Sequence, residues 1–256
     1  DINLQKYGDS LMINKFGSII AIEPSSGEIL SLINAPSFDP NLLIGRNRSK
    51  NYLELKNDTI GKPLFDRGLQ GQYPPGSTFK LVNGLIALQE KIIDDKTVIS
   101  CNQGHYYSSK RFMKCHCEIG TINDLNKAVY NSCNTYFANI YKRTIEKFPS
   151  HKNGINNWRS HVKSFGFGTY LGYDHPIGRP GLIPDSSYYD RWYPNGGWRA
   201  ATTISNGIGQ GEILTTPIQL ANLTAIIANR GWYKTPHFVK NISNDSINSK
   251  YKEKRY

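Results

Sequence analysis

The sequence predicts an α+β fold, because strand-like patterns near the N-terminus are followed by several helical ones. Residues 18–22 and 28–33 are rich in β-branched and aliphatic side chains, and they flank a turn in which Gly27 can take a positive φ. They therefore predict two strands joined by a tight turn. Helical periodicity dominates after residue 76, which indicates an α+β domain rather than alternating α/β units.

Length and composition restrict the class of protein only loosely. The 256 residues suit one large domain, and they contain neither a signal-peptide pattern nor a run of about 18 apolar residues that would span a membrane. The chain begins at Asp1, so we expect it to be part of a longer protein whose membrane anchor lies outside it. Its net charge of +11 allows an anionic partner, but the basic residues do not cluster on a helix and no nucleic-acid motif accompanies them. We expect no nucleic-acid partner.

The sequence predicts one domain over residues 1–240 and a polar, basic tail over residues 241–256. The tail is rich in asparagine, serine and lysine, so it is expected to be loop or disordered. Residues 35–72 contain several prolines and are predicted to be dominated by loops.

The helical segments are predicted from apolar residues at three- and four-residue steps. One helix begins near Phe79, after the residues Tyr-Pro-Pro-Gly at 73–76 break any regular element. Further helices are expected at residues 121–130, 138–147 and 158–165. The clearest is 216–229, which has Pro217 in its first turn and Gly231 after its end. It is apolar on nearly every side, so it is expected to be a buried central helix.

Ser77 and Lys80 form the first candidate catalytic motif. A serine hydroxyl is a weak nucleophile unless a base takes its proton, and residues three apart on a helix share one face. A helix N-terminus favours a neutral lysine and a developing oxyanion, so a buried Lys80 with a lowered pKa can act as the base. The same Ser-x-x-Lys spacing at Ser160 and Ser249 has no Pro-Pro-Gly before the serine, and we interpret both as chance.

Ser132 and Asn134 form the second candidate motif. A hydroxyl and an amide two residues apart, on a turn that leaves a helix, can face one cleft, where the serine relays a proton and the asparagine positions a substrate amide. Ser-x-Asn also occurs at Ser49 and Ser246. The order along the chain supports Ser132, because it follows Ser77 by 55 residues and lies between two predicted helices.

Residues 207–212 form a glycine-rich segment, Gly-Ile-Gly-Gln-Gly-Glu, before the 216–229 helix. A glycine-rich loop at a helix start can bind phosphate. No Walker lysine follows, however, and no strand–loop–helix dinucleotide unit surrounds the segment. We therefore predict a structural loop and no nucleotide cofactor.

Four cysteines lie close together in the sequence, and three interpretations of them remain open. Cys101, Cys115, His116 and Cys117 have the ligand types of a structural zinc site. A Cys101–Cys115 disulfide is equally consistent with an oxidising compartment, and free buried thiols are the third interpretation. Cys133 lies inside the Ser-x-Asn motif.

Four segments taken in order resemble the class B penicillin-binding proteins, most closely those of the elongation type. The resemblance covers about residues 1–240 and rests on residues 17–30, 73–80, 131–137 and 209–231. It implies the penicillin-binding protein/serine β-lactamase-like transpeptidase fold, which is an antiparallel sheet with a helical subdomain. It further implies that Ser77 is the acylated nucleophile, Lys80 its general base, Ser132 the proton relay and Asn134 the residue that positions the substrate.

The resemblance also implies an activity and a cellular setting. The activity is a peptidoglycan D,D-transpeptidase that cross-links D-Ala-D-Ala-ended stem peptides during cell-wall elongation, and β-lactam antibiotics would inhibit it by acylating Ser77. The parent would be anchored in the inner membrane, with this domain on the periplasmic or extracytoplasmic side. Its implied partners are a polytopic membrane glycosyltransferase and other proteins of the elongation complex.

One departure from the family pattern concerns its third motif, Lys-Thr/Ser-Gly, which is absent. Lys234 and Thr235 are followed by Pro236, which would break a central strand, so they are not that motif. We expect the last sheet strands to lie beyond Tyr256, and residues 1–256 alone to have little or no transpeptidase activity. A β-lactam-sensing binding domain, a serine β-lactamase and an inactive structural partner of a cell-wall synthase remain as alternatives.

Overall fold

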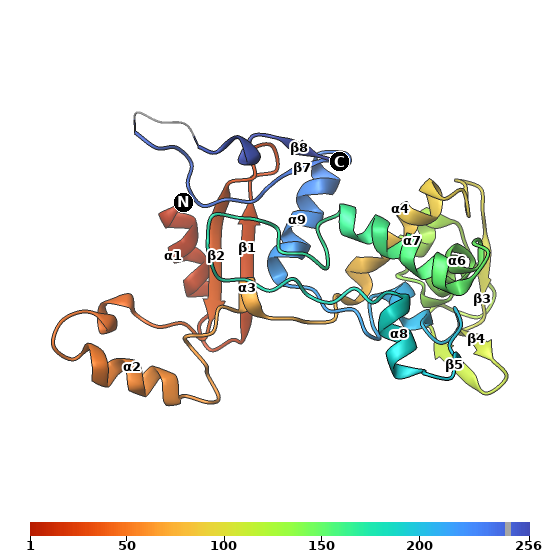
Figure 1. Cartoon of the computed structure of the whole chain (residues 1–256), viewed down its shortest axis with the longest axis horizontal. Helices are drawn as coiled ribbons and strands as arrows, with labels where there is room; N and C mark the ends of the chain where they lie inside the picture. The colour runs from red at the N-terminus through yellow and green to blue at the C-terminus, as the bar shows by residue number, and fades with distance from the viewer. Residues whose placement is uncertain (244–246) are drawn as a thin grey trace. The chain divides into compact units, whose positions relative to one another are not determined.

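A computed structural model describes residues 1–243 and 247–256 (Figure 1). The chain divides into two compact units. Unit 1 consists of Asp1–Tyr73, Phe165–Gly181 and Thr215–Tyr256, and unit 2 consists of Pro74–Ser164 and Leu182–Leu214. The sequence predicted a single domain over residues 1–240, whereas the structure divides this stretch into two units, each with its own apolar core.

Unit 1 is built on an antiparallel pair of strands, β1 (Gly17–Ile22) and β2 (Ile29–Ala35), which lie side by side in Figure 1. Residues of β2 alternate between buried and half-buried, so one face of the pair packs on the core. Gly27 in the connecting turn has φ +82°, and a Cβ there would lie 3.0 Å from a carbonyl oxygen of Thr235. The predicted hairpin is therefore confirmed.

The remaining elements of unit 1 are mostly helical. They are α1 (Ile2–Leu11), η1 (Pro40–Leu43), α2 (Arg48–Asn57), α3 (Arg67–Gln70), α9 (Pro217–Ala228), β7 (Tyr233–Lys234), η4 (Ser249–Tyr251) and β8 (Lys254–Arg255). Because α2 and α3 lie within residues 35–72, the prediction that loops dominate this segment was wrong in part. A local signal for α3 was present, since the Asp66 carboxylate accepts the backbone N–H of Leu69.

The predicted helix at 216–229 is confirmed as α9, with one difference in burial. Gln219 accepts the backbone N–H of Thr216 at 3.0 Å, and Pro217 occupies the first helical position. Ile218 and Ile226 are buried, but the side chain of Ile227 is 44% exposed. The helix therefore has one exposed side and is not buried all round.

The end of the chain is more regular than the expected loop or disordered tail. Strand β8 pairs antiparallel with β7, and the buried Tyr251 of η4 lies with its ring centroid 5.1 Å from that of His237. This aromatic contact and the strand pairing account for the difference. Residues 244–246 of the predicted tail lie outside the described residues.

Unit 2 consists of helices and two short antiparallel strand pairs. Its helices are η2 (Gly76–Phe79), α4 (Lys80–Gln89), α5 (Leu125–Tyr130), α6 (Asn134–Glu146), α7 (His151–Ser164), α8 (Ser186–Trp192) and η3 (Ile204–Ile208). Its strand pairs are β3 (Ile99–Cys101) with β6 (Thr121–Asn123), and β4 (Gly104–Ser108) with β5 (Arg111–Lys114). The predicted helix at 121–130 is thus a strand followed by a helix, because Asp124 caps α5 through the N–H of Lys127.

Buried aromatic side chains fill the centre of unit 2. Phe137 and Tyr141 of α6 and Trp158 of α7 are fully buried, and the rings of Tyr141 and Trp158 meet edge to face at 5.4 Å. Within the described part of the chain, no helix is both long and apolar enough to cross a membrane.

Candidate active site

Ser77 lies in η2, the tight turn that leads into α4. Gly76 has φ +62°, and its N–H donates to the carbonyl of Gly209 at 2.8 Å, so the chain reverses just before the serine. Ser77 is exposed, whereas Lys80, one helical turn later, is only 3% exposed. The predicted break at Pro-Pro-Gly therefore places an accessible hydroxyl before a buried amine.

Three oxygen atoms surround the amine of Lys80. Its Nζ donates to the backbone oxygen of Ser132 at 2.6 Å, to the Ser132 Oγ at 2.9 Å and to the Asn134 Oδ1 at 2.7 Å. Burial lowers the pKa of Lys80, and the nearby cysteine thiols oppose that shift in smaller measure. A lysine with a lowered pKa is more easily deprotonated near neutral pH, as a general base must be.

The hydroxyl of Ser132 connects the amine to the nucleophile. Ser132 Oγ donates to Ser77 Oγ at 2.9 Å, and the same oxygen accepts from Lys80. The three-residue spacing of Ser77 and Lys80 on a helix predicted that Lys80 would reach Ser77 directly. The structure brings the two together through Ser132 instead.

Backbone conformation explains how Ser132 and Asn134 both reach Lys80. Ser132 has φ +47°, a left-handed conformation that is strained for a residue with a Cβ. Cys133 is then extended and caps α6, accepting the N–H of Tyr136 at 3.4 Å. Asn134 starts the helix, with its Nδ2 donating to the carbonyl of Lys114 at 2.8 Å.

The glycine-rich segment supports the nucleophile turn, as its predicted structural role requires. Gly209 has φ +71°, and a Cβ there would lie 2.1 Å from the carbonyl oxygen of Gly76. Asn83 of α4 holds the same segment, because its Nδ2 donates to the carbonyls of Asn206 and Gly207 at 3.0 Å each. Sequence reasoning missed Asn83. Its signal was a polar amide within the apolar repeat of a predicted helix.

A second group of side chains, Cys101, Cys115, Cys117 and Cys133, lies behind this site and is called the thiol cluster below. All four are buried free thiols, and their sulfur atoms lie within 4.8 Å of one another. The Sγ of Cys115 is 3.4 Å from that of Cys117 and 3.8 Å from that of Cys133.

The zinc-ligand set predicted from sequence was wrong in one member. His116 is exposed and outside the thiol cluster, because burial alternates along this segment and only Cys115 and Cys117 on either side of it are buried. Cys133 takes its place. The alternative disulfide between Cys101 and Cys115 is not formed, since both are free thiols.

The four thiols differ in how readily they ionise. Burial raises the pKa of Cys117 to about 11, and it raises that of Cys133 as well. Burial also opposes ionisation of Cys115, but donors from Cys117, Thr135 and Asn134 outweigh it and lower the pKa of this thiol to about 6. Cys115 is therefore the thiol of the cluster that loses its proton most readily.

An exposed serine, joined through a second serine to a buried lysine at a helix start, defines the class of serine acyl-transferases with the penicillin-binding fold. The penicillin binding protein transpeptidase domain model matches residues 17–256, and the chain belongs to this family. The predicted α+β transpeptidase fold is confirmed.

Two similar proteins share the name peptidoglycan D,D-transpeptidase MrdA. The chain is 36% identical over 243 residues to the peptidoglycan D,D-transpeptidase MrdA of Acinetobacter baumannii, an alignment that covers 94% of this chain and 34% of that protein. It is 34% identical over 246 residues to MrdA of Haemophilus influenzae, covering 94% and 36%. The chain thus spans about a third of the length of these relatives.

Solved structures agree with this grouping. Pseudomonas aeruginosa PBP2, in complex with WCK 5153, superposes with a TM-score of 0.84 at 31% identity, covering 97% of this chain and 54% of that one. PBP2 from Helicobacter pylori gives 0.83 at 30% identity, covering 98% and 46%. The resemblance to elongation-type proteins that the sequence motifs indicated is therefore confirmed.

Proposed function

We propose that the protein is a serine-type D,D-transpeptidase that cross-links peptidoglycan stem peptides during cell-wall elongation, through an acyl-enzyme on Ser77. The observation that carries this proposal is the hydrogen-bonded connection from Lys80 through Ser132 to Ser77. The similarity to MrdA proteins supports the choice of peptidoglycan as the substrate class.

The proposed chemistry begins with the neutral amine of Lys80. Ser77 Oγ attacks the carbonyl carbon of the D-Ala-D-Ala amide, while its proton passes to Ser132 and the proton of Ser132 passes to Lys80. The amide C–N bond then breaks, D-alanine leaves with a proton, and an ester to Ser77 remains. An acceptor amine next attacks the ester, the ester C–O bond breaks, and the proton released by the amine returns to Ser77.

The proposed role of Asn134 differs from the one expected from sequence. Both polar ends of its amide already contact the protein, at Lys80 and at the carbonyl of Lys114. An amide nitrogen has two N–H groups and an amide oxygen two lone pairs, so one of each remains for a substrate. We therefore assign Asn134 to holding Lys80 in place, and its free N–H to substrate contact.

We infer further that the thiol cluster holds a structural zinc ion. Tetrahedral zinc bound to thiolates at about 2.3 Å places sulfur atoms about 3.8 Å apart, and the measured separations of 3.4 and 3.8 Å fit that geometry. Cys101, Cys115, Cys117 and Cys133 would be the ligands. The ion would supply a cross-link between α6 and the segments around β3 and β5, and so fix the backbone that presents Ser132 and Asn134.

The proposed setting is the extracytoplasmic side of the inner membrane, in a parent protein that carries its own anchor. Proposed partners are a polytopic glycosyltransferase and other elongation-complex proteins. Two similar structures support this choice: a complex of PBP2 with MreC from Helicobacter pylori and a peptidoglycan synthase complex that coordinates polymerization and crosslinking.

The proposed function is tested on the full-length protein with a fluorescent penicillin and a D-Ala-D-Ala-ended donor peptide. We expect covalent labelling of the wild type, no labelling of Ser77→Ala, and release of D-alanine with formation of a new amide when an acceptor amine is added. Labelling that survives Ser77→Ala would refute Ser77 as the nucleophile. Labelling without any turnover of the donor peptide would identify a β-lactam-sensing domain instead.

A further inference from the structure

Asn206 of η3 is fully buried and lies at the centre of a hydrogen-bond network in unit 2. Its Nδ2 donates to the hydroxyl of Tyr189 at 2.8 Å and to that of Tyr141 at 3.3 Å, one N–H to each. The O–H of Tyr189 in turn donates to Glu212 Oε2 at 2.8 Å. Burial raises the pKa of Tyr189, so its hydroxyl keeps the proton that it donates. The side chain of Asn206 therefore connects α6, α8 and the glycine-rich segment.

The backbone carbonyl of Asn206 links this network to the nucleophile turn. It accepts the N–H of Gly209 at 3.2 Å and the Nδ2 of Asn83 at 3.0 Å. The carbonyl of Gly209 accepts the N–H of Gly76, the residue directly before the nucleophile, at 2.8 Å. Asn83 belongs to α4, the helix that begins with Lys80. One carbonyl is therefore connected both to the turn that carries the nucleophile and to the helix that carries the base.

The glycine-rich segment needs support from outside its own backbone. A Cβ at Gly207 would lie 2.9 Å from the Cβ of Tyr141, and Gly211 has φ +75°, so the close packing and the turns of this segment depend on glycine. Glycine loses more conformational freedom on folding than any other residue. The hydrogen bonds of Asn206 and Glu212 hold the two ends of the segment and so offset this cost.

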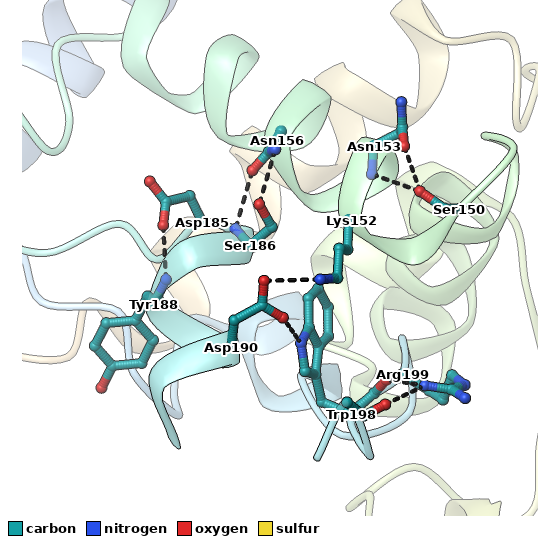
Figure 2. Close-up of polar contacts among 11 residues, drawn as sticks. Ser150, Lys152, Asn153, Asn156, Asp185, Ser186, Tyr188, Asp190, Trp198 and Arg199 are labelled. Carbon is teal, nitrogen blue, oxygen red and sulfur yellow. Dashed lines mark hydrogen bonds and ion pairs between the residues drawn. The ribbon is translucent and has the colours of Figure 1, made fainter. Parts of the chain in front are cut away.

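Helix α8, which carries Tyr189, is itself anchored to α7 (Figure 2). Asn156 of α7 donates to Ser186 Oγ at 3.0 Å and accepts the N–H of Ser186 at 2.9 Å. One turn further along α8, Asp190 pairs with Lys152 of α7 at 2.8 Å. Figure 2 shows these contacts as dashed lines between the two helices. The hydroxyl of Tyr189 therefore comes from a fixed helix.

The network has a defined direction of donation. Thr203 Oγ1 donates its hydrogen to the carbonyl of Ala200 at 3.2 Å, so Tyr141 O–H is the donor in its 2.9 Å contact with Thr203 Oγ1. Satisfied buried networks of this kind specify one arrangement of the groups that they join. Their net effect on stability is smaller, because apolar groups of the same shape can replace a hydrogen-bonded pair at little cost.

We propose that Asn206, Tyr189 and Glu212 are positioning residues for the nucleophile. They hold the carbonyl of Gly209 where it accepts the backbone N–H that precedes Ser77, and so keep the nucleophile oxygen within hydrogen-bond distance of its proton relay. This inference rests on the proposed transpeptidase function. It adds to that function three residues that act through the backbone of the nucleophile turn and take no part in the bond-making steps.

The test measures acylation of the full-length protein over a range of concentrations of a fluorescent penicillin. This separates the limiting rate constant of acylation from the dissociation constant of the noncovalent complex. In Tyr189→Phe the ring remains and the hydroxyl is lost. We expect the limiting rate constant to fall about 10-fold and the dissociation constant to stay within about 2-fold, because a displaced nucleophile slows bond formation more than binding. Partial unfolding would instead lower the fraction of chains that are labelled.

Tyr173→Phe is the matched control. Tyr173 is also buried, and its O–H donates to the carbonyl of Ile177 at 3.1 Å in unit 1. Each tyrosine variant loses one buried hydrogen bond, so both should lower the melting temperature by a similar amount, about 3 °C. Only Tyr189→Phe should slow acylation.

A second pair of variants changes the acceptor at Glu212. Glu212→Gln should keep the limiting rate constant within about 2-fold of wild type, because its amide oxygen still accepts from Tyr189, whereas Glu212→Leu should slow acylation about as much as Tyr189→Phe. Glu212 is only half-buried, so this pair tests the network even if Tyr189→Phe does not fold.

Two outcomes would overturn this inference and leave the proposed function intact. The first is a limiting rate constant within about 2-fold of wild type in Tyr189→Phe or Glu212→Leu. The second is an equal slowing in Tyr173→Phe. A wild type that penicillin does not acylate at Ser77 would refute both the inference and the proposed function.

Discussion

The three residues Ser132, Cys133 and Asn134 serve two different sites on opposite sides of one segment. The side chains of Ser132 and Asn134 contact the buried amine of Lys80, whereas Cys133 joins the thiol cluster. At the first site, the amine of Lys80 must change its protonation state during the reaction. The thiol cluster is a buried group drawn from separate segments of the chain. The comparison suggests that the thiols position the segment and that the polar side chains perform the chemistry.

Replacement of Lys80 by arginine should have the largest effect on the acylation rate. The site at Lys80 depends on proton transfer, whereas the thiol cluster does not. Arginine keeps the positive charge but is not deprotonated in proteins. We expect acylation of Ser77 by a fluorescent penicillin to slow by about 10³-fold, within the range of lost general-base catalysis. The control is Lys127→Arg, an exposed position on α5. A rate near wild type in Lys80→Arg would show that the amine is not the base.

The pH dependence of acylation should report the same group. Only the neutral amine of Lys80 accepts a proton, so the acylation rate should rise with pH and level off above the pKa of this residue. Burial lowers that pKa from its ordinary value of 10.5, which moves the rising limb toward neutral pH. Measured acylation rates from pH 5 to 10 test this. A limb centred at or above pH 10.5 would contradict it.

Disruption of the thiol cluster should mainly lower the free energy of unfolding. If zinc is bound, Cys117→Ser should abolish the expected stoichiometry of one ion per chain and lower the free energy of unfolding by about 3 kcal/mol, as loss of a tightly bound ligand does. Metal analysis and thermal unfolding measure the two effects. His116→Ala is the matched control, because this residue is adjacent in sequence but exposed and outside the cluster. Loss of metal in His116→Ala, or its retention in Cys117→Ser, would refute the assignment.

The two sites also differ in how far the sequence predicted them. Lys80 and the three residues around it were identified because short motifs place polar groups at helix starts, which local geometry fixes. The thiol cluster depends on strand pairing and on the direction of each side chain, so the sequence suggested His116 and left Cys133 out. The hollow lined by Tyr188, Trp192 and Glu212 was not predicted, since it needs α8 folded beside the glycine-rich segment. The motif at 207–212 indicated a structural loop but not the hydrogen bond that its Gly209 carbonyl accepts from the N–H of Gly76.

Gly209→Ala should disturb the nucleophile turn from outside both sites. The added Cβ would lie 2.1 Å from the carbonyl oxygen of Gly76, and φ is +71°. We expect a loss of about 2 kcal/mol in the free energy of unfolding and roughly 10-fold slower penicillin acylation, from strain and displacement of Ser77. Gly197→Ala is the control, since a Cβ there meets no atom within 4 Å. Equal effects in the two variants would mean that the contact with Gly76 is not what requires glycine.

The smallest expected effect is on stability and concerns the backbone strain at Ser132. Two substitutions of this residue separate that strain from the loss of its hydroxyl. Ser132 has φ +47°, where a side chain costs about 1–2 kcal/mol relative to glycine, and glycine in turn loses about 0.5–1 kcal/mol through the entropy of the unfolded chain. Ser132→Gly and Ser132→Ala both remove the hydroxyl that joins Lys80 to Ser77, so they should slow acylation equally. In denaturant unfolding, however, the glycine variant should be the more stable by about 0.5–1 kcal/mol. If the alanine variant is instead the more stable by about 0.5–1 kcal/mol, the left-handed backbone at this position is not strained, and the polar contacts alone hold the segment between the two sites.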